Sequence, residues 1–319
     1  MLFDRILSAS KRVANYIGPT PVFTSGTVDK LTGRNVFFKA ENLQKTGSFK
    51  IRGALNAIIL LKENKVQTNG VVTHSTGNHG SGLACAAQMV GVPCTVVVPH
   101  TTASVKIDAI RWYGADVVFC EPTQQSRKET CERVSTEQNL SFVPAYDDYD
   151  VMAGQGTIGV EMCEQIPDLD AVLVMTSGGG LIAGIATAIK GIKPNVKVYA
   201  VEPEGKDLQR SLESGERMWV GPPRTLDTVA DATPTQQVGQ LTWPIVRDLV
   251  EKQVFTVKDD EIISAMKFTW TRLKLVVEAA SAGPVAAVLS DEMKAVNPSV
   301  KNVGVLICGG NVNIDQLPW

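Results

Sequence analysis

The sequence has no long hydrophobic run, no block of like charge and no excess of either sign. No apolar run in its 319 residues approaches the roughly 18 residues that a membrane-spanning helix needs. The 31 basic and 33 acidic residues are dispersed along the chain, so we expect neither a nucleic-acid nor a membrane partner. The opening residues, MLFDRILSASKRVANYIG, carry an early acid and predict neither a signal peptide nor an anchor.

Paired cysteines are also missing. The six cysteines, at 85, 94, 120, 131, 163 and 308, form no C-x-x-C pair and follow no regular spacing. This excludes a disulfide framework and a zinc ribbon, and it predicts reduced thiols in a cytoplasmic protein. His74 and His79 are five residues apart, which does not place two metal ligands on one helix face, so we expect ordinary hydrogen-bonded histidines.

What the sequence does contain is an alternation of short β-branched runs with alanine-rich helical segments. Continuous apolar strands between helices predict an α/β fold of two domains, each a mostly parallel twisted sheet covered by helices. The domains expected are 1–69 with 148–319, and an inserted smaller unit at 70–147. The predicted strands are 71–74, 94–99, 116–120, 171–175, 196–201 and 303–307, and the clearest predicted helices are 80–90, 102–113 and 181–189.

A single lysine, Lys50, lies between a turn-like Thr46-Gly47-Ser48 and the start of a predicted helix. An amine on a rigid element can form a Schiff base with an aldehyde, and burial or cationic neighbours make it a better nucleophile or base. Taken alone, the segment is equally typical of a solvated lysine at a helix start.

The segment Thr176-Ser177-Gly178-Gly179-Gly180-Leu181-Ile182-Ala183-Gly184 follows a predicted strand and opens a helix. Glycines let backbone amides approach an anion, and the helix N-terminus favours negative charge, so the segment predicts a phosphate site. The same residues fit the dinucleotide pattern G-x-G-x-x-A, with Glu202 near the place of a ribose-binding acid. The spacing alone leaves NAD open.

Three further segments carry polar groups near predicted strand ends, and Glu278 lies apart from them. The loop Ser75-Thr76-Gly77-Asn78-His79-Gly80 offers hydroxyls, an amide and free N–H groups, which suit a carboxylate. Cys308-Gly309-Gly310-Asn311 places a weak thiol donor after the last strand, where a buried small hydrophobe is the alternative. Glu202 with Asp207 supplies hard oxygen ligands, and Glu278 is either a site acid or a solvated helix residue.

Taken together, these segments resemble the serine racemase and serine/threonine dehydratase family of pyridoxal-phosphate enzymes. The order and spacing carry the resemblance across nearly the whole chain. The matching pieces are Glu41 to Lys50 (ENLQKTGSFK), Ser75 to His79 (STGNH), Ala153 to Thr157 (AGQGT), the glycine loop and Cys308 to Asn311 (CGGN). Leu31 to Asn35 (LTGRN) and Trp243 to Leu249 (WPIVRDL) are similar to eukaryotic serine racemases in particular, which have the tryptophan synthase β-like fold.

The resemblance implies roles for these residues. Lys50 would hold pyridoxal 5'-phosphate as a Schiff base and remove the substrate α-proton, Phe49 would pack on the ring, Asn78 would bond the ring 3-oxygen, and Cys308 would face the ring nitrogen. Glu278 would act at the catalytic site. The residues expected to cradle the phosphate are Ser177, Gly178, Gly179 and Gly180.

The resemblance also implies the substrate, ion and nucleotide contacts. The substrate carboxylate would lie on Ser75, Thr76, Gly77, Asn78 and His79, with help from Arg127. Glu202 and Asp207 would bind Mg²⁺, or Ca²⁺ or Mn²⁺ in its place. ATP, an allosteric activator in the racemases, would lie at the interface of a homodimer. The residues at comparable places are Thr24, Ser25, Lys45, Thr46, Tyr113, Lys274 and Asn311.

The activity that follows is racemisation of serine, with β-elimination of water from serine or threonine. The sequence departs from the racemases at Thr76, where they place a serine as the acid on the opposite face of the substrate, and at Cys308 and Ser81, where serine and glutamine are usual. Tyr146 and Cys308 are closer to the dehydratases, so a dedicated serine/threonine ammonia-lyase is the alternative. An NAD oxidoreductase leaves Lys50 unexplained, and a non-catalytic binding protein leaves Lys50 and Glu278 unexplained.

Overall fold

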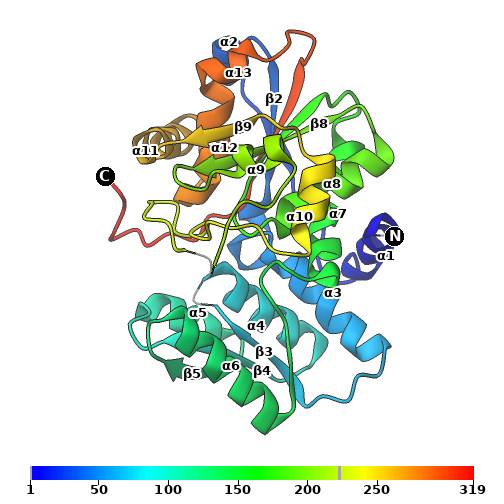
Figure 1. Ribbon diagram of the computed structural model, residues 1–319, viewed down its shortest axis with the longest axis vertical. Coiled ribbons are helices and arrows are strands. Elements are labelled where there is room, and N and C mark those ends of the chain that lie inside the picture. Colours follow the sequence, from blue (N-terminus) through cyan, green and yellow to red (C-terminus); the bar gives the residue numbers. More distant parts are fainter. Residues whose placement is uncertain (1, 76, 222–223) are drawn as a thin grey trace.

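The computed structural model describes residues 2–75, 77–221 and 224–319, and in these ranges the chain forms two sheets (Figure 1). The larger sheet has six strands in the order β1-β2-β10-β7-β8-β9, all parallel to their neighbours except the antiparallel pair β1 and β2. Its strands are β1 (Val22–Thr24), β2 (Asn35–Ala40), β7 (Ala171–Met175), β8 (Lys197–Pro203), β9 (Val254–Val257) and β10 (Asn302–Ile307).

The smaller sheet has four parallel strands in the order β5-β4-β3-β6 and lies in the lower half of Figure 1. Strands β3 and β4 are buried almost throughout, as the apolar runs of the sequence predict. The strands of this sheet are β3 (Gly70–His74), β4 (Cys94–Pro99), β5 (Asp116–Cys120) and β6 (Leu140–Phe142).

Helices connect the strands of both sheets. No helix in the described ranges is long and apolar enough to cross a membrane. The helices are α1 (Leu2–Val13), α2 (Gly26–Thr32), α3 (Lys50–Glu63), α4 (Asn78–Val90), α5 (Ser104–Trp112), α6 (Gln124–Gln138), α7 (Tyr149–Gln165), α8 (Gly180–Ile192), α9 (Leu208–Ser214), α10 (Thr242–Leu249), α11 (Asp259–Phe268), α12 (Ala279–Leu289) and α13 (Asp291–Ala295), with short turns η1 (Glu41–Leu43), η2 (Lys45–Gly47) and η3 (Thr269–Leu273).

The predicted α/β class, with mostly parallel sheets, is confirmed, and each predicted strand and helix is present to within a few residues. The assignment of 70–147 to a separate domain stays a prediction. Helix α3 lies outside that range, yet its Ile51, Leu55 and Ile58 join Val71 of β3 and Leu83 of α4 in one buried apolar cluster. Helix α3 therefore contributes to the apolar core beside the smaller sheet, although it lies outside 70–147.

The Ala153-to-Thr157 segment lies in α7, where its glycines allow helices to touch. A Cβ atom added to Gly154 would lie 2.5 Å from the Cα of Gly53 in α3, and one added to Gly156 would lie 2.8 Å from the carbonyl oxygen of Gly184 in α8. Both distances are too short for a side chain, so only glycine lets α7 pack this closely on α3 and α8. The Gln155 side chain accepts a hydrogen bond from the Gly53 amide at 3.1 Å.

A buried ionic network anchors the start of α3. The Arg52 guanidinium donates to both carboxylate oxygens of Glu41, at 2.7 and 2.8 Å, and to both of Glu161, at 2.6 and 2.9 Å. Lys39 also donates to Glu161 and, at 2.8 Å, to the Thr20 carbonyl. Arg52 and Glu41 are fully buried, so each charge depends on the other for the solvation that water no longer supplies.

Candidate active site

Lys50 is the first residue of α3 and lies beside the segment that follows β10. The Phe49 amide donates to the Cys308 carbonyl at 3.1 Å, and Ser48 forms an antiparallel bridge with Gly309. The Lys50 amine donates to the Ala145 carbonyl at 2.8 Å and lies 5.1 Å from the centre of the Phe49 ring. These contacts fix the amine at the junction of three segments that are far apart in sequence.

Removal from water lowers the pKa of Lys50 to about 8, while the nearby Cys308 and Glu278 act in the opposite direction. An ordinary lysine has a pKa near 10.4 and is almost wholly protonated at neutral pH. With a pKa of about 8, about a tenth of the Lys50 side chains carry a neutral amine at pH 7. The neutral amine is the form that attacks an aldehyde or accepts a proton.

The glycine loop joins β7 to α8, and its backbone leaves amide groups free. Gly179 has a φ of +89°, in the left-handed region that favours glycine, and the helix start has no side-chain cap. The first amide that bonds within this turn belongs to Ala183, which donates to the Gly179 carbonyl at 2.9 Å. The amides before it point out of the helix N-terminus, which suits a phosphate.

Residues 145–147 connect the glycine loop to Lys50. A Cβ atom on Gly178 would lie 2.4 Å from the Tyr146 ring, and one on Gly180 would lie 2.6 Å from the Tyr146 carbonyl oxygen. The Ala145 carbonyl accepts from the Lys50 amine. The Asp147 carboxylate accepts hydrogen bonds at 2.9–3.2 Å from the amides of Thr242, the first residue of α10, and of the two residues before it. The glycines at 178 and 180 are therefore needed for contact with this segment as well as for a ligand.

Cys308 is buried at the end of β10, and its thiol lies 3.1 Å from the Ser281 hydroxyl. Burial raises the pKa of Cys308 to about 12, with a further contribution from Glu278, so the thiol stays neutral. Ser281 also accepts from the Gly309 amide at 2.7 Å and donates to the Gly309 carbonyl at 2.6 Å. The sequence analysis did not identify Ser281, which had no signal beyond its position in α12.

Asn78 and Glu278 are brought together although 200 residues separate them. The Asn78 amide donates to both carboxylate oxygens of Glu278, at 2.9 and 3.0 Å, and its own oxygen accepts from the Asn311 amide at 2.8 Å. Burial raises the pKa of Glu278 to about 7, against the opposing effect of Asn78. Glu278 is thus a buried acid beside Asn78 and not a solvated helix residue, and its catalytic role stays a prediction.

The predicted carboxylate loop leads into α4. Thr76 lies outside the described residues. Gly77 precedes α4 without a side-chain cap, so the first amides of the helix are available to an anion. His79 is buried, its Nε2 lies 3.0 Å from the Val143 carbonyl, and burial lowers its pKa to about 3, so the ring is neutral. A Cβ atom on Gly80 would lie 2.4 Å from the Ser75 carbonyl oxygen, which keeps this turn tight.

Arg127 lies in the first turns of α6, which packs on β3. Its Nε is buried without a hydrogen-bond partner among the described residues. Its charge acts on His74, whose pKa is lowered by burial and by this neighbour. Because His74 directly precedes the Ser75 loop, Arg127 is close enough to that loop to add positive charge there.

The residues suggested for ATP are only partly linked by described contacts. The Asn311 amide donates to the Thr46 carbonyl at 2.7 Å. Burial raises the pKa values of Cys85 in α4 and of Tyr113; Lys45 opposes the shift at Cys85, and Cys85 adds to the shift at Tyr113. The remaining three lie elsewhere on the chain, with Thr24 at the end of β1, Ser25 before α2 and Lys274 after η3.

The residues suggested for a divalent cation do not form a cation cage. Glu202 is buried, and its two oxygens accept from the Leu208 amide at 3.2 Å each, whereas the Asp207 side chain is exposed. Between them in sequence lies Lys206, whose buried amine donates to two backbone carbonyls. Burial lowers the pKa of Lys206 and raises that of Glu202, while each group opposes the shift of the other. The described residues hold no cluster of three or more His, Cys, Asp or Glu suited to a metal ion.

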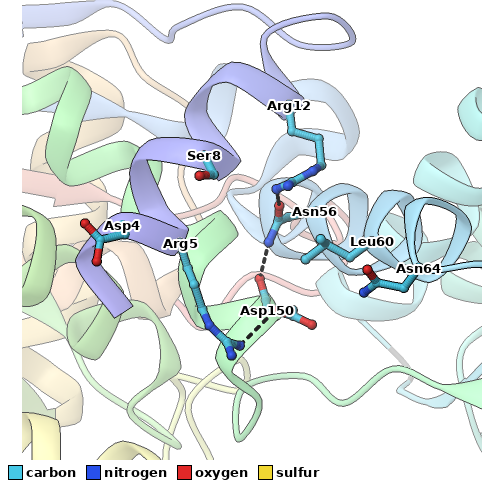
Figure 2. A pocket seen from close by; sticks show the side chains of 8 residues that line it. All are labelled: Asp4, Arg5, Ser8, Arg12, Asn56, Leu60, Asn64 and Asp150. Atoms are coloured by element: carbon cyan, nitrogen blue, oxygen red, sulfur yellow. Dashed lines mark hydrogen bonds and ion pairs between the residues drawn. The ribbon is translucent and has the colours of Figure 1, made fainter. Parts of the chain in front are cut away.

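A surface pocket of about 420 Å³ lies away from this site (Figure 2). It is formed by α1, α3 and the start of α7, and its polar groups bond one another. The Arg5 guanidinium donates to Asp150 at 3.3 Å, and Arg12 donates to Asn56 at 2.6 Å. It includes none of the predicted site residues, so we do not assign it to catalysis.

The donors around Lys50 fit pyridoxal phosphate. A partly neutral amine suits the aldehyde, the free amides of the α8 start suit the phosphate, and the neutral Cys308 thiol suits an unprotonated ring nitrogen. A dinucleotide would need a free acid for its ribose hydroxyl, and the sequence offers Glu202 for that role. The Glu202 carboxylate already accepts a hydrogen bond from the Leu208 amide.

Comparison with known proteins agrees with this fit. The family described as pyridoxal-phosphate dependent enzyme matches residues 13–309. A serine racemase of Mus musculus is 44% identical over 99% of this chain and 93% of its own length. A beta-hydroxyaspartate dehydratase of Paracoccus denitrificans is 41% identical over 99% of this chain and 98% of its own.

Among solved structures, the crystal structure of a pyridoxal 5'-phosphate-dependent aspartate racemase has a TM-score of 0.96 and 51% identity. The match covers 99% of this chain and 97% of the aspartate racemase chain. These matches set aside the NAD alternative. The chain therefore belongs to the pyridoxal-phosphate dependent enzyme family, among its racemases and ammonia-lyases.

Proposed function

We propose that this enzyme interconverts L- and D-serine and also eliminates water from serine and threonine. The observation that carries the proposal is the full-length similarity to serine racemases, combined with a lysine of lowered pKa at the family's cofactor position. A dedicated ammonia-lyase, the alternative from the sequence, is less well supported by the relatives found.

The binding roles follow from the donors described. The free amides of Ser177 to Gly180 and the α8 start would hold the phosphate, Phe49 and Asn78 would contact the ring, and Cys308 would face its nitrogen. The Ser75-to-His79 loop and the uncapped start of α4 would bind the substrate carboxylate. When bound, pyridoxal phosphate supplies an electron sink for negative charge at the α-carbon.

Proton transfer would be the work of the side chains. The Lys50 amine removes the α-proton from one face of the substrate, and such positioned base catalysis is typically worth about 10²–10⁴-fold. Racemisation then requires a proton donor on the opposite face, for which the sequence offers the Thr76 hydroxyl. Glu278, near Lys50 and bonded to Asn78, holds or releases a proton in the neutral pH range.

Elimination uses the same first step. Loss of the α-proton and the β-hydroxyl releases one molecule of water from serine. Hydrolysis of the remaining enamine gives pyruvate and ammonia, and threonine gives 2-oxobutanoate in the same way. The two reactions therefore compete for one deprotonated state, and the proton donor decides between them.

A second candidate is an acidic amino acid such as aspartate. It is favoured by the 51% identity to an aspartate racemase and by Arg127, whose buried Nε has no hydrogen-bond partner in the described part of the chain. A guanidinium beside the carboxylate loop suits a second carboxylate on the substrate. Arg127→Met should then reduce turnover of aspartate far more than that of serine.

The resemblance further supports a homodimer, activation by ATP and a cytoplasmic location. Sedimentation of the cofactor-loaded enzyme tests the homodimer, and the rate of L-serine turnover with and without ATP tests the activation. A divalent cation at Glu202 and Asp207 is not part of this proposal, because Lys206 engages the carbonyl groups near them.

The deciding experiment is one incubation of the cofactor-loaded enzyme with L-serine, in which D-serine and pyruvate are measured together. Parallel incubations receive L-threonine and L-aspartate, and Lys50→Ala serves as the inactive control. D-serine formation that Lys50→Ala abolishes supports the proposal. Pyruvate without D-serine would establish the ammonia-lyase alternative, and D-aspartate alone would establish the second candidate.

The role of Thr76 has a separate test. If its hydroxyl is the opposite-face donor, Thr76→Ala should lower D-serine formation more than pyruvate formation, and Thr76→Ser should restore the ratio. Equal loss of both products would show that Thr76 only positions the substrate.

A further inference from the structure

Lys206 is a fully buried lysine outside the machinery described above. It lies in the turn between β8 and α9, and its amine donates to the carbonyl oxygens of Thr235 at 2.7 Å and Gln236 at 2.9 Å. The amine also lies 5.9 Å from the centre of the Trp219 ring. Burying an amine is costly, so an arrangement that aims two carbonyls at it is a built cation site.

The turn around Lys206 is shaped to bring the amine inward. Gly205 and Asp207, on either side of it, have φ values of +88° and +59°, both in the left-handed region. The Lys206 carbonyl accepts from the Trp219 indole at 2.8 Å, and the Gly205 carbonyl accepts from the Gln236 side chain at 3.2 Å. This conformation turns the Asp207 side chain to solvent and the Lys206 side chain to the interior.

The ligands that a hard cation would need are therefore already engaged. Backbone carbonyls and carboxylates are the groups that bind Mg²⁺ and Ca²⁺, and here the Thr235 and Gln236 carbonyls bind the amine. Glu202 bonds the Leu208 amide and the Thr256 hydroxyl. A metal ion beside the ammonium would also meet like charge in a poorly solvated region.

We propose that Lys206 is a covalently tethered cation that replaces a bound metal ion in this enzyme. The ammonium group organises the 235–242 segment as a metal would, and the folded enzyme then needs no divalent cation near Glu202.

The segment that Lys206 holds leads directly to the phosphate loop. Shortly after Gln236 in the sequence, the Val238 carbonyl accepts a hydrogen bond from Arg217 at 2.9 Å. The next residue, Gly239, donates its amide to the Gly178 carbonyl of the phosphate loop at 2.9 Å. The Thr242 hydroxyl donates to the same Gly178 carbonyl at 2.9 Å. Lys206 is thus a positioning residue for the glycine loop, acting through residues 235–242.

The test is thermal unfolding of the cofactor-loaded enzyme, without nucleotide, after dialysis against EDTA and after addition of MgCl₂ or CaCl₂. For wild type we expect the same midpoint in all three conditions and no binding of either ion by calorimetry. Lys206→Met keeps the bulk but not the charge, and leaves two partly buried carbonyls without a donor, so its midpoint should fall by about 3–7 °C and not respond to either ion. Lys252→Ala, at an exposed lysine, is the matched control and should change nothing.

Lys206→Ala removes the amine and opens space in front of the two carbonyls. Without added ions, its unfolding midpoint should fall as far as that of Lys206→Met. Addition of Ca²⁺ or Mg²⁺ should raise the midpoint again, and the variant should then retain its cofactor more tightly than it does without ions. A wild-type midpoint that rises with Mg²⁺, and no longer does so in Glu202→Gln, would overturn the proposal. So would a Lys206→Met protein as stable as wild type, or a Lys206→Ala protein that responds to ions no more than Lys206→Met does.

Discussion

Replacing Arg52 by methionine should destabilise the enzyme more than any comparable change at the surface. Methionine keeps most of the packing volume but leaves the Glu41 carboxylate, which is fully buried, without its guanidinium partner. Glu161 is 16% exposed and keeps its ion pair with Lys39. The loss of stability therefore comes mainly from the buried Glu41 carboxylate, which no longer has a guanidinium partner.

The magnitude follows from that charge. Removing one partner of a buried ion pair typically costs about 3–5 kcal/mol. At about 2.1 cal/mol/K per residue, cooperative unfolding of this chain has an entropy of about 0.7 kcal/mol/K. The expected fall in melting temperature is therefore about 4–7 °C at pH 7.

The pH dependence gives a second signature. In the wild type, burial opposes ionisation, yet Arg52 and other partners hold the pKa of Glu41 below its usual value. This stabilisation is present above the unfolded-state pKa of about 4.3 and is lost as the pH falls through the lower folded-state pKa. Without Arg52, burial raises the pKa of Glu41, so the stability gap between variant and wild type should narrow as the pH falls from 7 toward 5.

The assay is calorimetric melting of the cofactor-loaded proteins at pH 5, 6 and 7. The control is Arg133→Met, which breaks an exposed pair with Glu137 on α6, where both side chains are more than half exposed. Such pairs are worth about 0–1 kcal/mol, so the control should shift by about 1 °C or less. If the melting temperature of Arg52→Met equals that of Arg133→Met at every pH, the buried network does not stabilise this fold.

Three further predictions concern the site. Capture of pyridoxal phosphate by the apoprotein, trapped by borohydride, should rise with pH around a midpoint of about 8, the pKa of Lys50. Gly178→Ala places a Cβ 2.4 Å from the Tyr146 ring, and overpacking of about 1–3 kcal/mol should weaken cofactor binding by about 5- to 150-fold in fluorescence titrations. Because the pKa of Glu278 is raised to about 7, wild-type apoprotein should lose stability as the pH rises from 5 to 8, and Glu278→Gln should reduce this loss in urea titrations.

Each of these predictions has a contradicting result. A capture midpoint near 10 would mean that Lys50 is an ordinary solvated lysine. Gly26→Ala, at a glycine with open space around it, should leave cofactor affinity unchanged, and an equal effect of the two alanines would reject the packing argument. A pH slope in Glu278→Gln equal to that of wild type would place the titrating group elsewhere.

Hydrophobic patterning was sufficient to predict the parallel sheets, because strands such as β3, β4 and β7 are buried over nearly their whole length and appear as continuous apolar runs. It did not identify β2. Nor did it identify the short strands β1, β6 and β9, whose three or four residues carry too little pattern to distinguish them from loops. Nor did it identify the role of α3 in the core beside the smaller sheet. That role depends on Ile51, Leu55 and Ile58 meeting β3 and α4 in space.

In the site, motifs were enough to locate Lys50, the glycine loop and Asn78, because each follows or opens a regular element. The partners of these groups had no such signal. The Ala145 carbonyl and the Ser281 hydroxyl contact the site through tertiary packing alone. Lys206 and Asp207 are adjacent in the sequence, and only the left-handed backbone of this turn decides which of them faces inward.

The strand order has a consequence for synthesis of the chain. Strand β10 lies between β2 and β7, so the large sheet cannot close until residues 302–307 have been made. At ribosomal rates of about 5–20 residues per second, β2 waits roughly 15–50 seconds for its partner. The four-stranded sheet comes from one continuous segment and can begin to form much earlier. Because Ser48 pairs with Gly309 and Phe49 with Cys308, the surroundings of Lys50 are completed last, so a nascent chain cannot capture its cofactor before the large sheet closes.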